Sequence, residues 1–503
     1  MKIVFCYPSW TGEYGLFGHF AKRNSTWPPL NLALLAAIVR QHGHEAVILD
    51  GEAEGLKPDE LARRALALKP DIVALTGYSP FFHLSVDVAD AVKRQAPLQT
   101  VIIGGPHTTI IKERALEENL SLDYGFMGEC EKSLPHFLGA YEYAHRHGLV
   151  VKDWSVPGLL YRYGGQVRRG PDPQFVDGET KRGSELGRYP LDAFPFPARE
   201  LLPMRRYRLG TMHGRRHFSS IQSMRGCPWQ CIFCCSNELQ TTRVVMRSPA
   251  SVVGEMVETV RAFPYVDHFY IVDDVLTLWP AHIREICDRM DAAGLHVTFE
   301  GSTRANLVDD ALIARLAKSG LVRLSFGLET TDPEMRVTMQ KKVPLDAYVE
   351  ANRICAKYNV EAMNSMMIGL PGETRETVRE TLRWLRNARD VKQANFAIAI
   401  PYPGTEFHRM AVNHTNGVEL RSENFAEYLR YGSAVTNVGE LTAQDLIDLQ
   451  NEGFVSIYSA PWRWKAMFKK HGVIGFLLMM WRVVKLWRRK VAQPFRVHPG
   501  VPA

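Results

Sequence analysis

The sequence predicts an α/β protein with two successive parallel-sheet domains and a helical C-terminal region. Short apolar runs alternate with amphipathic helical stretches, and this alternation fades near residue 146 and resumes near Ser219. A chain of 503 residues is also too long for one ordinary core. The expected boundaries are 1–145 and 216–410 for the two domains, 146–215 for a connection over the surface with a few short strands, and 411–503 for the helical region.

Five strand-like runs define the first domain: "KIVFCY", "EAVILD", "DIVALTGY", "TVIIGG" and "DYGFMG". Helical patterns between them predict a parallel sheet that is covered on both faces. Ligands of such sheets bind outside the carboxyl ends of the strands. One such loop alone is explained by a tight turn, but four on one rim favour a ligand site. The candidate contacts at this rim are Ser9, Thr76, Ser79, Gly104, Gly105, Gly128 and Glu129.

Six further runs follow in the second domain: "SSIQSM", "HFYIVD", "HVTFEG", "VRLSFGLE", "AMNSMMIGL" and "NFAIAIPY". Helical patterns between them predict six βα units, which form an incomplete barrel or a curled parallel sheet. The chemistry of such a fold is expected at the carboxyl ends of its strands.

Half of the eight cysteines lie in one short stretch, "MRGCPWQCIFCCSN". No charged and apolar leader precedes the first strand, so we expect a reducing, cytoplasmic location in which disulfides are disfavoured. Cys227, Cys231 and Cys234 have the spacing C-x3-C-x2-C. Three thiolates do not complete a tetrahedral zinc site, but they suit an iron–sulfur cluster in which one iron has no protein ligand. A zinc site completed by a distant histidine and a redox thiol pair stay open as alternatives.

The remaining cysteines are expected to be bystanders. Cys235 lies outside the spacing, and Cys6, Cys130, Cys287 and Cys355 are most simply buried small apolar residues.

This spacing, with Phe233 directly before the last cysteine, resembles the signature of the radical S-adenosylmethionine (SAM) superfamily. The resemblance implies a partial (β/α)6 barrel of the TIM type and a 4Fe-4S cluster on the three cysteines. It also implies that SAM binds the remaining iron and is cleaved to a 5′-deoxyadenosyl radical.

Further motifs resemble segments of that superfamily that hold SAM: "FGLET", "IGLPGET", "DD" and "GSTRAN". A Gly-Gly-Glu stretch that often binds the amino group is replaced here by "IVDDVL". For each motif alone, a turn or a structural salt bridge is an equally good explanation. The residues that the resemblance assigns to SAM are Asp274, Arg304, Glu329, Gly369 and Gly372.

The first domain, with "WPPLNLALLAAIVRQHGHEAVILD", "GGPHTT" and "MGECEKSLP", is similar to the cobalamin-binding domains that precede many radical enzymes. This resemblance implies a flavodoxin-like (Rossmann-like) fold and a cobalamin at the rim described above. The motif D-x-H-x-x-G, whose histidine binds cobalt, does not occur, so the cobalamin is expected to lack a histidine lower ligand. Plain nucleotide binding is the alternative, and the absence of G-x-G-x-x-G disfavours it.

Together these resemblances imply a cobalamin-dependent radical SAM enzyme. Methylation of an unactivated carbon in a small, hydrophobic substrate is expected, with electrons from a reductant such as a flavodoxin or ferredoxin. Ring formation or rearrangement with the same cofactors, as in the anaerobic magnesium-protoporphyrin ester cyclase, is the main alternative. A tRNA methylthiotransferase and a non-catalytic cobalamin sensor rank lower.

The net charge of +7 comes from the C-terminal end. Residues 453–503 contain ten Lys and Arg and no acid, so the rest of the chain carries +7 minus 10, or −3. A nucleic-acid partner is therefore not expected. The basic tail, rich in tryptophan, predicts either an interfacial helix on an anionic membrane or a helix that packs on the core. Its uncharged run, Gly472–Trp481, is shorter than the roughly 20 residues that span a bilayer.

Overall fold

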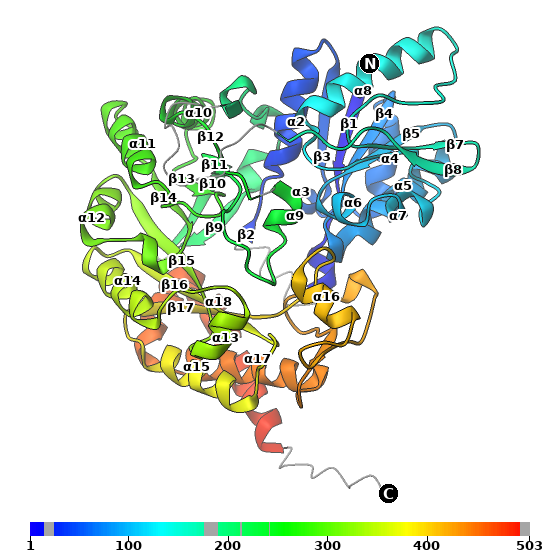
Figure 1. The fold of residues 1–503 in the computed structure, drawn as a ribbon. Coiled ribbons are helices and arrows are strands. Elements are labelled where there is room, and N and C mark those ends of the chain that lie inside the picture. Colours follow the sequence, from blue (N-terminus) through cyan, green and yellow to red (C-terminus); the bar gives the residue numbers. More distant parts are fainter. Residues whose placement is uncertain (15–24, 176–189, 212–213, 241, 493–503) are drawn as a thin grey trace, which may run out of the picture.

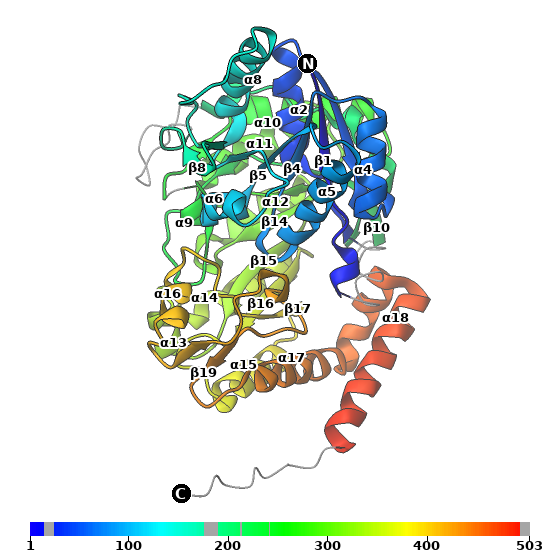
Figure 2. The same ribbon diagram turned by 90° about the vertical axis from the view of Figure 1, so that its right-hand side faces the viewer.

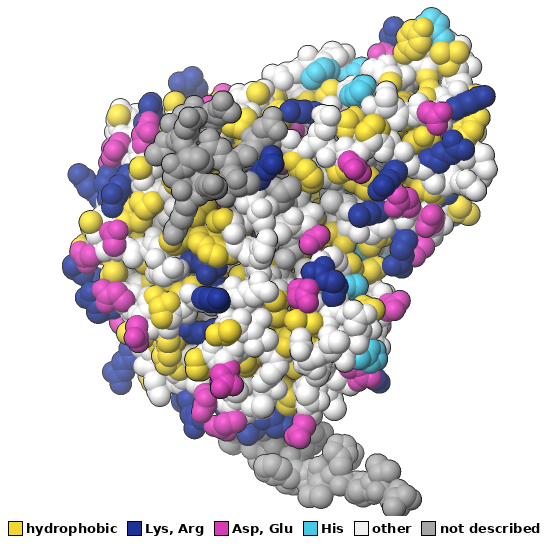
Figure 3. Space-filling view, viewed as in Figure 1, with side chains coloured by type: hydrophobic (Ala, Val, Ile, Leu, Met, Phe, Trp, Pro, Cys, Tyr) yellow, Lys and Arg dark blue, Asp and Glu magenta, His cyan; other side chains and the backbone are white. Residues whose placement is uncertain are grey.

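The computed structural model describes residues 1–14, 25–175, 190–211, 214–240 and 242–492. Two α/β domains lie side by side, the first in blue and cyan and the second in green and yellow (Figure 1). The C-terminal helices follow along the second domain. On the face shown in Figure 3, cationic and anionic side chains are interspersed over both domains.

The first domain has the predicted flavodoxin-like sheet. Its strand order is β3-β1-β4-β5-β6-β7-β8, and the first five of these are parallel. β1 lies between β3 and β4, and its alternate residues enter two different cores: Ile3 and Phe5 face one, and Val4 and Cys6 face the other. The parallel strands are β1 (Lys2–Tyr7), β3 (Glu45–Asp50), β4 (Ile72–Thr76), β5 (Thr100–Gly104) and β6 (Tyr124–Phe126).

Helices cover both faces of this sheet. The face that contains Phe5 packs against α2 (Leu30–Gln41) and α8 (Cys130–Arg146), and the other face packs against α4 (Pro58–Ala67) and α5 (Phe82–Gln95). Shorter helices lie in the connections: α3 (Gly51–Glu54), α6 (Pro106–Ile111) and α7 (Arg114–Glu117).

The second domain is the predicted partial barrel. Its sheet has the order β17-β16-β15-β14-β13-β10-β9-β2, in which the strands from β10 to β17 are parallel and sequential. Among the described residues no pairing joins β17 to the other end of this sheet, so the barrel is incomplete. The six parallel strands are β10 (Gly214–Ile221), β13 (His268–Ile271), β14 (Thr298–Thr303), β15 (Leu321–Glu329), β16 (Glu361–Ile368) and β17 (Val391–Ile398).

The barrel helices follow these strands in turn. They are α10 (Pro249–Ala262), α11 (Pro280–Ala292), α12 (Asp310–Lys318), α14 (Leu345–Lys357) and α15 (Arg375–Asn387), with the short α9 (Ser236–Gln240) and α13 (Pro333–Thr338). A small hairpin pairs β11 (Met224–Arg225) with β12 (Val245–Met246).

Both sheets contain strands beyond those that the sequence predicts for each domain. In the predicted connection, β7 (Leu159–Tyr163) and β8 (Gln166–Arg169) extend the first sheet, whereas β9 (Arg208–Thr211) belongs to the second. β2 (Ser25–Thr26), from the N-terminal part of the chain, pairs with β9. The domains are thus interleaved in sequence, and their exact limits stay predictions.

The C-terminal region contains α16 (Glu406–Val412), α17 (Ala443–Tyr458) and α18 (Pro461–Ala492). It also contains a two-stranded sheet, β18 (Val418–Leu420) with β19 (Thr436–Val438), which the sequence did not indicate. α18 bends sharply at Gly472 and then projects from the body (Figure 2). None of the described helices combines the length and apolar character that crossing a bilayer requires.

A buried hydrogen bond ties the connection to the first sheet. The Tyr207 hydroxyl, in a residue with no exposed surface, donates to Asp50 Oδ2 over 2.6 Å. Burial and the Asp50 carboxylate raise the pKa of Tyr207, so the hydroxyl stays protonated.

Tyr207→Phe is expected to lower the free energy of unfolding by about 2 kcal/mol, because a hydrogen bond to a buried charge is lost. Urea denaturation measures this, and the exposed Tyr143→Phe should change it by less than about 0.5 kcal/mol. Equal effects of the two variants would contradict this role.

Candidate active site

The three spaced cysteines lie on the loop between β11 and α9, beyond the carboxyl end of β10. Gly226 lets this loop turn: its φ is +93°, and a Cβ there would lie 1.9 Å from the Arg243 carbonyl oxygen. Burial is the main cause that raises the pKa of Cys227 to about 11, and nearby Asp274, Cys234 and Cys231 add to it. The thiols therefore lie close enough to interact electrostatically.

These thiols fit a multi-iron cluster. All are free and half-buried. A 4Fe-4S cluster places each thiolate on a different iron, and three thiols on one loop suit such a cluster. Lys341 and Arg304 act against burial on the pKa of Cys231, and these cations would compensate thiolate charge.

Four of the five residues that the resemblance assigned to SAM lie near the cysteine loop, namely Asp274, Arg304, Glu329 and Gly369. Asp274 Oδ1 accepts a hydrogen bond of 3.2 Å from Ser236, and the Arg304 guanidinium lies 4.2 Å from the ring centre of Trp229. Arg304 Nε is buried and has no hydrogen-bond partner among the described residues. Glu329 Oε1 accepts from Lys341 Nζ over 2.6 Å. Leu370, next to Gly369, packs in one apolar cluster with Ile232 of the loop.

Gly372, the fifth of these residues, follows Gly369 in the "IGLPGET" motif. Both Gly369 and Gly372 have positive φ, at +94° and +84°. A buried arginine with an unpartnered donor, beside a loop of thiols, fits the carboxylate of SAM. Of the two, Gly372 is exposed, so a ligand could approach its backbone closely.

Two polar residues of this region were not among the predicted contacts. Lys341 is buried between Glu329 and Cys231, and no sequence pattern indicates it. Glu373 belongs to the "IGLPGET" motif, and its carboxylate accepts from the Gly369 and Leu370 amides at 2.5 and 3.3 Å. Burial nevertheless raises the pKa of Glu373 to about 8, so it is mainly protonated at neutral pH.

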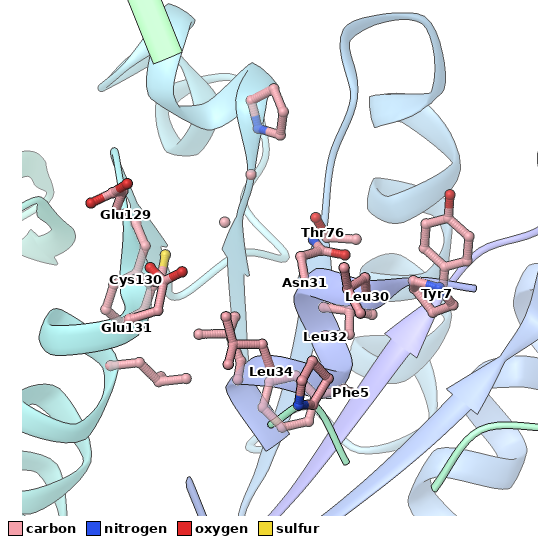
Figure 4. A pocket seen from close by; sticks show the side chains of 18 of the residues that line it. Phe5, Tyr7, Leu30, Asn31, Leu32, Leu34, Thr76, Glu129, Cys130 and Glu131 are labelled. Carbon is pink, nitrogen blue, oxygen red and sulfur yellow. The ribbon is translucent and has the colours of Figure 1, made fainter. Parts of the chain in front are cut away.

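A cavity of about 660 Å³ lies between the domains, at the carboxyl edge of the first sheet. Glu129, Cys130 and Glu131 line one side of it, and Thr76 lies across from them beside Asn31 (Figure 4). The first turns of α2 contribute Leu30, Asn31 and Leu34. The second domain contributes Ser220, Gln222, Arg225, Leu239, Arg247, Glu255 and Val272.

The cavity brings together most of the predicted contacts of the first domain. Its walls include Thr76, Gly104, Gly105, Gly128 and Glu129. Ser9 and Ser79 are not part of these walls. The Ser9 hydroxyl donates to Glu52 Oε2 over 2.9 Å, and the Ser79 hydroxyl lies 3.0 Å from His107 Nδ1.

The position of one cysteine differs from the expectation. Cys6, Cys287 and Cys355 are buried, but Cys130 is half-buried and lines the cavity. It is the first residue of α8, where the chain leaves the strand end, and this position turns it toward the ligand side.

Cavity and residues fit a large ligand with apolar and polar parts. Thr76 is 4% exposed, and its Oγ1 has no hydrogen-bond partner in the described chain, so it can bind a ligand. Gly105 has φ +102°, and a Cβ there would come within 2.8 Å of Thr76 Oγ1. No histidine occurs among the described residues that line the cavity. Cobalamin, a broad ring with polar edges, suits these walls.

The cavity adjoins the cysteine loop through one arginine. Arg225 pairs with Glu129 at 3.1 Å and with Glu131 at 2.6 Å, and all three side chains are about nine-tenths buried. Arg225 stands two residues before Cys227, so these ion pairs connect the rim of the first sheet to the start of the loop.

Two family descriptions match the chain. Residues 19–138 match the B12 binding domain, and residues 221–385 match the Radical SAM superfamily. The chain belongs to the cobalamin-dependent radical SAM enzymes. A 4Fe-4S cluster, SAM and cobalamin are therefore its cofactors, as predicted.

Similar proteins support this assignment over nearly the whole length. An uncharacterized methyltransferase of Pyrococcus horikoshii is 28% identical over 452 residues, which cover 90% of this chain and 92% of the relative. The anaerobic magnesium-protoporphyrin IX monomethyl ester cyclase of Cereibacter sphaeroides is 24% identical, over 95% of this chain and 74% of the relative. The fold resembles that of the radical SAM methyltransferase TsrM from Kitasatospora setae, with a TM-score of 0.68 at 17% identity, 98% coverage of this chain and 100% of that one.

Cys231→Ala is expected to abolish assembly of the cluster in this radical SAM enzyme. The variant removes one of three thiolates, so iron bound after anaerobic reconstitution should fall from about four per chain to near zero. Cys235→Ala is the matched control and should retain the iron. Iron analysis and visible absorption measure both. Loss of iron in both variants, or in neither, would contradict the assignment of the ligands.

Gly105→Ala is expected to weaken cobalamin binding by about ten-fold or more. The new Cβ would lie against Thr76 Oγ1 and displace this hydroxyl from the cavity wall, and the loss of one hydrogen bond to the ligand costs about 1.4 kcal/mol of binding free energy. Equilibrium dialysis with hydroxocobalamin measures the affinity. Gly139→Ala, where a Cβ meets nothing within 4 Å, is the control and should leave affinity unchanged. Unchanged binding in Gly105→Ala would place the cofactor elsewhere.

Proposed function

We propose that the enzyme transfers a methyl group from SAM to an unactivated carbon of a small, hydrophobic substrate. The observation that carries this proposal is the contact between the cavity and the cysteine loop through Arg225. A methyl donor in the cavity and a radical source on the loop would then face a common space. The methyltransferase relative, which matches most of both chains, supports methylation.

The residues of this chain would divide the work by position. When bound, the cluster and SAM supply a 5′-deoxyadenosyl radical, and cobalamin supplies the methyl group. Cys227, Cys231 and Cys234 would hold the cluster, and Lys341 would offset its charge. Arg304 would orient the carboxylate of SAM through the donor that is unpartnered in the structure.

Apolar side chains of the cavity and of the cysteine loop suit a hydrophobic substrate. Leu191 and Phe194 of the connection and Leu239 and Val272 of the second domain line the cavity. Trp279 and Leu307 pack with Trp229 and Cys227 beside the loop. Such walls exclude water and other hydrogen donors from a reactive carbon radical.

The net reaction balances with two molecules of SAM and two electrons. One SAM gives its methyl group and leaves as S-adenosylhomocysteine. The other is cleaved to methionine and 5′-deoxyadenosine, which carries the hydrogen atom taken from the substrate carbon. We propose a small cytoplasmic reductant such as a flavodoxin or ferredoxin as the electron source.

Radical ring formation is the second candidate, because the cyclase relative also matches most of this chain. It would use the same radical source but no methyl transfer. The two reactions therefore differ in their SAM-derived products.

Methyl transfer predicts that the reconstituted enzyme forms S-adenosylhomocysteine and 5′-deoxyadenosine together. The experiment supplies SAM with a deuterated methyl group, dithionite or reduced flavodoxin, and a lipid-soluble cell extract as the substrate source. Mass spectrometry follows both nucleosides and the appearance of deuterated methyl groups in extract compounds. Cys231→Ala should form no 5′-deoxyadenosine. Formation of 5′-deoxyadenosine with no S-adenosylhomocysteine and no label in product would favour the cyclase reaction.

A further inference from the structure

The second half of α18, after the bend at Gly472, presents an apolar face to solvent. Exposure of its large side chains ranges from 42% to 70%, although such side chains normally lie in the core. The six residues of this face, here called the α18 face, are Val473, Ile474, Leu477, Leu478, Trp481 and Val484.

Helical spacing places the α18 face on one side of the helix only. Its residues recur at intervals of three and four, which returns them to the same side at each turn. The other side packs on the first half of α18: the Phe476 ring centre lies 6.2 Å from that of Trp464 and 6.1 Å from that of Phe468. The two halves thus contact each other through these rings, and the α18 face lies outside this contact.

The start of the helix that carries the α18 face is attached to the second domain. Arg463, near the start of α18, is fully buried and donates to the carbonyl oxygens of Leu385, Ala388 and Val391. α18 also contacts β17 at one edge of the partial barrel and β9 and β10 near the other. After the bend, the helix projects away from both domains (Figure 2). These contacts attach α18 to the second domain.

Charge indicates which partner covers the α18 face. Residues 453–503 carry ten cationic side chains and no acid. A second copy of this chain would bring its own ten cations, so two such segments would repel each other. Next to the face, Lys485 Nζ lies 4.9 Å from the ring centre of Trp481, a pairing of cation and indole that suits the boundary between lipid and water.

We propose that the α18 face docks on the surface of an anionic lipid bilayer. The helix would lie in the plane of the interface, with its apolar residues among the acyl chains and the basic segment near the headgroups. Because α18 contacts strands near both edges of the incomplete barrel, docking would bring the bilayer beside that side of the second domain. This inference does not depend on the proposed methyl transfer.

Co-sedimentation of the full-length protein with vesicles tests the proposal without cofactors or turnover. The vesicles contain phosphatidylcholine alone or mixed with phosphatidylglycerol. We expect binding to the mixed vesicles, weaker binding at high salt, and loss of about ten-fold or more in Leu477→Glu/Trp481→Glu. The control Leu98→Glu/Leu120→Glu changes two side chains of the first domain that are 97% and 81% exposed, and it should bind like the wild type. Thermal unfolding checks that each variant is folded.

Several outcomes would overturn the proposal. One is no binding of the wild type to mixed vesicles, and another is an equal loss in both double variants. Equal binding to the two kinds of vesicle would exclude recognition of anionic lipid. If the wild type sediments as a dimer that Leu477→Glu/Trp481→Glu dissociates, and vesicles do not bind, the α18 face belongs to a second copy of this chain. Deoxyadenosine formation is measured separately, so failure here does not bear on the methyl-transfer proposal.

Discussion

The buried pairing of Arg225 with Glu129 and Glu131 is the interaction on which the joint site depends. A guanidinium with so little exposure is costly unless carboxylates compensate it, and here both carboxylates come from the other domain. The backbone of Arg225 leads directly into the cysteine loop, while Glu129 lies at the cavity wall. Loss of Arg225 would leave two buried carboxylates next to each other without the guanidinium, so this contact favours one relative position of the two cofactor sites.

Other polar groups of the site are stabilised either by an opposite charge or by a change in pKa that favours the neutral form. Lys341 is buried, and it is balanced by Glu329 and by its closeness to the thiol of Cys231. No cation among the described residues pairs with Glu373, and burial raises its pKa instead, so its neutral form is favoured. Thr76 Oγ1 and Arg304 Nε are buried and have no hydrogen-bond partner among the described residues. Unpartnered polar atoms therefore occur where ligands are expected, among walls that are otherwise apolar.

The sequence predicts the fold well because it is rich in periodic signals. All eleven strand-like runs correspond to strands, since parallel strands buried on both faces leave continuous apolar stretches between helical patterns. The cysteine spacing lies within one loop and is likewise readable. The wall that the second domain contributes to the cavity was not predicted, because Gln222, Leu239 and Val272 meet the first domain only through tertiary packing. Lys341 was not predicted for a similar reason. Its partner Glu329 ends β15 and meets it only in the folded protein, and a single lysine does not form a recognisable motif. The Ser9 hydroxyl bonds to Glu52, a contact between distant residues that local sequence does not encode.

The short strand β2 has a consequence for how this chain is assembled. It arises near the N-terminus, yet it completes the edge of the second sheet by pairing with β9, about 180 residues later. The polypeptide therefore reaches the second sheet before α2, α4 and α5 of the first domain begin. On the ribosome, the first domain would emerge with this strand unpaired until residues beyond 208 follow it. A single cut between the domains could not yield two complete halves, because the barrel would lose its outermost strand to the other fragment.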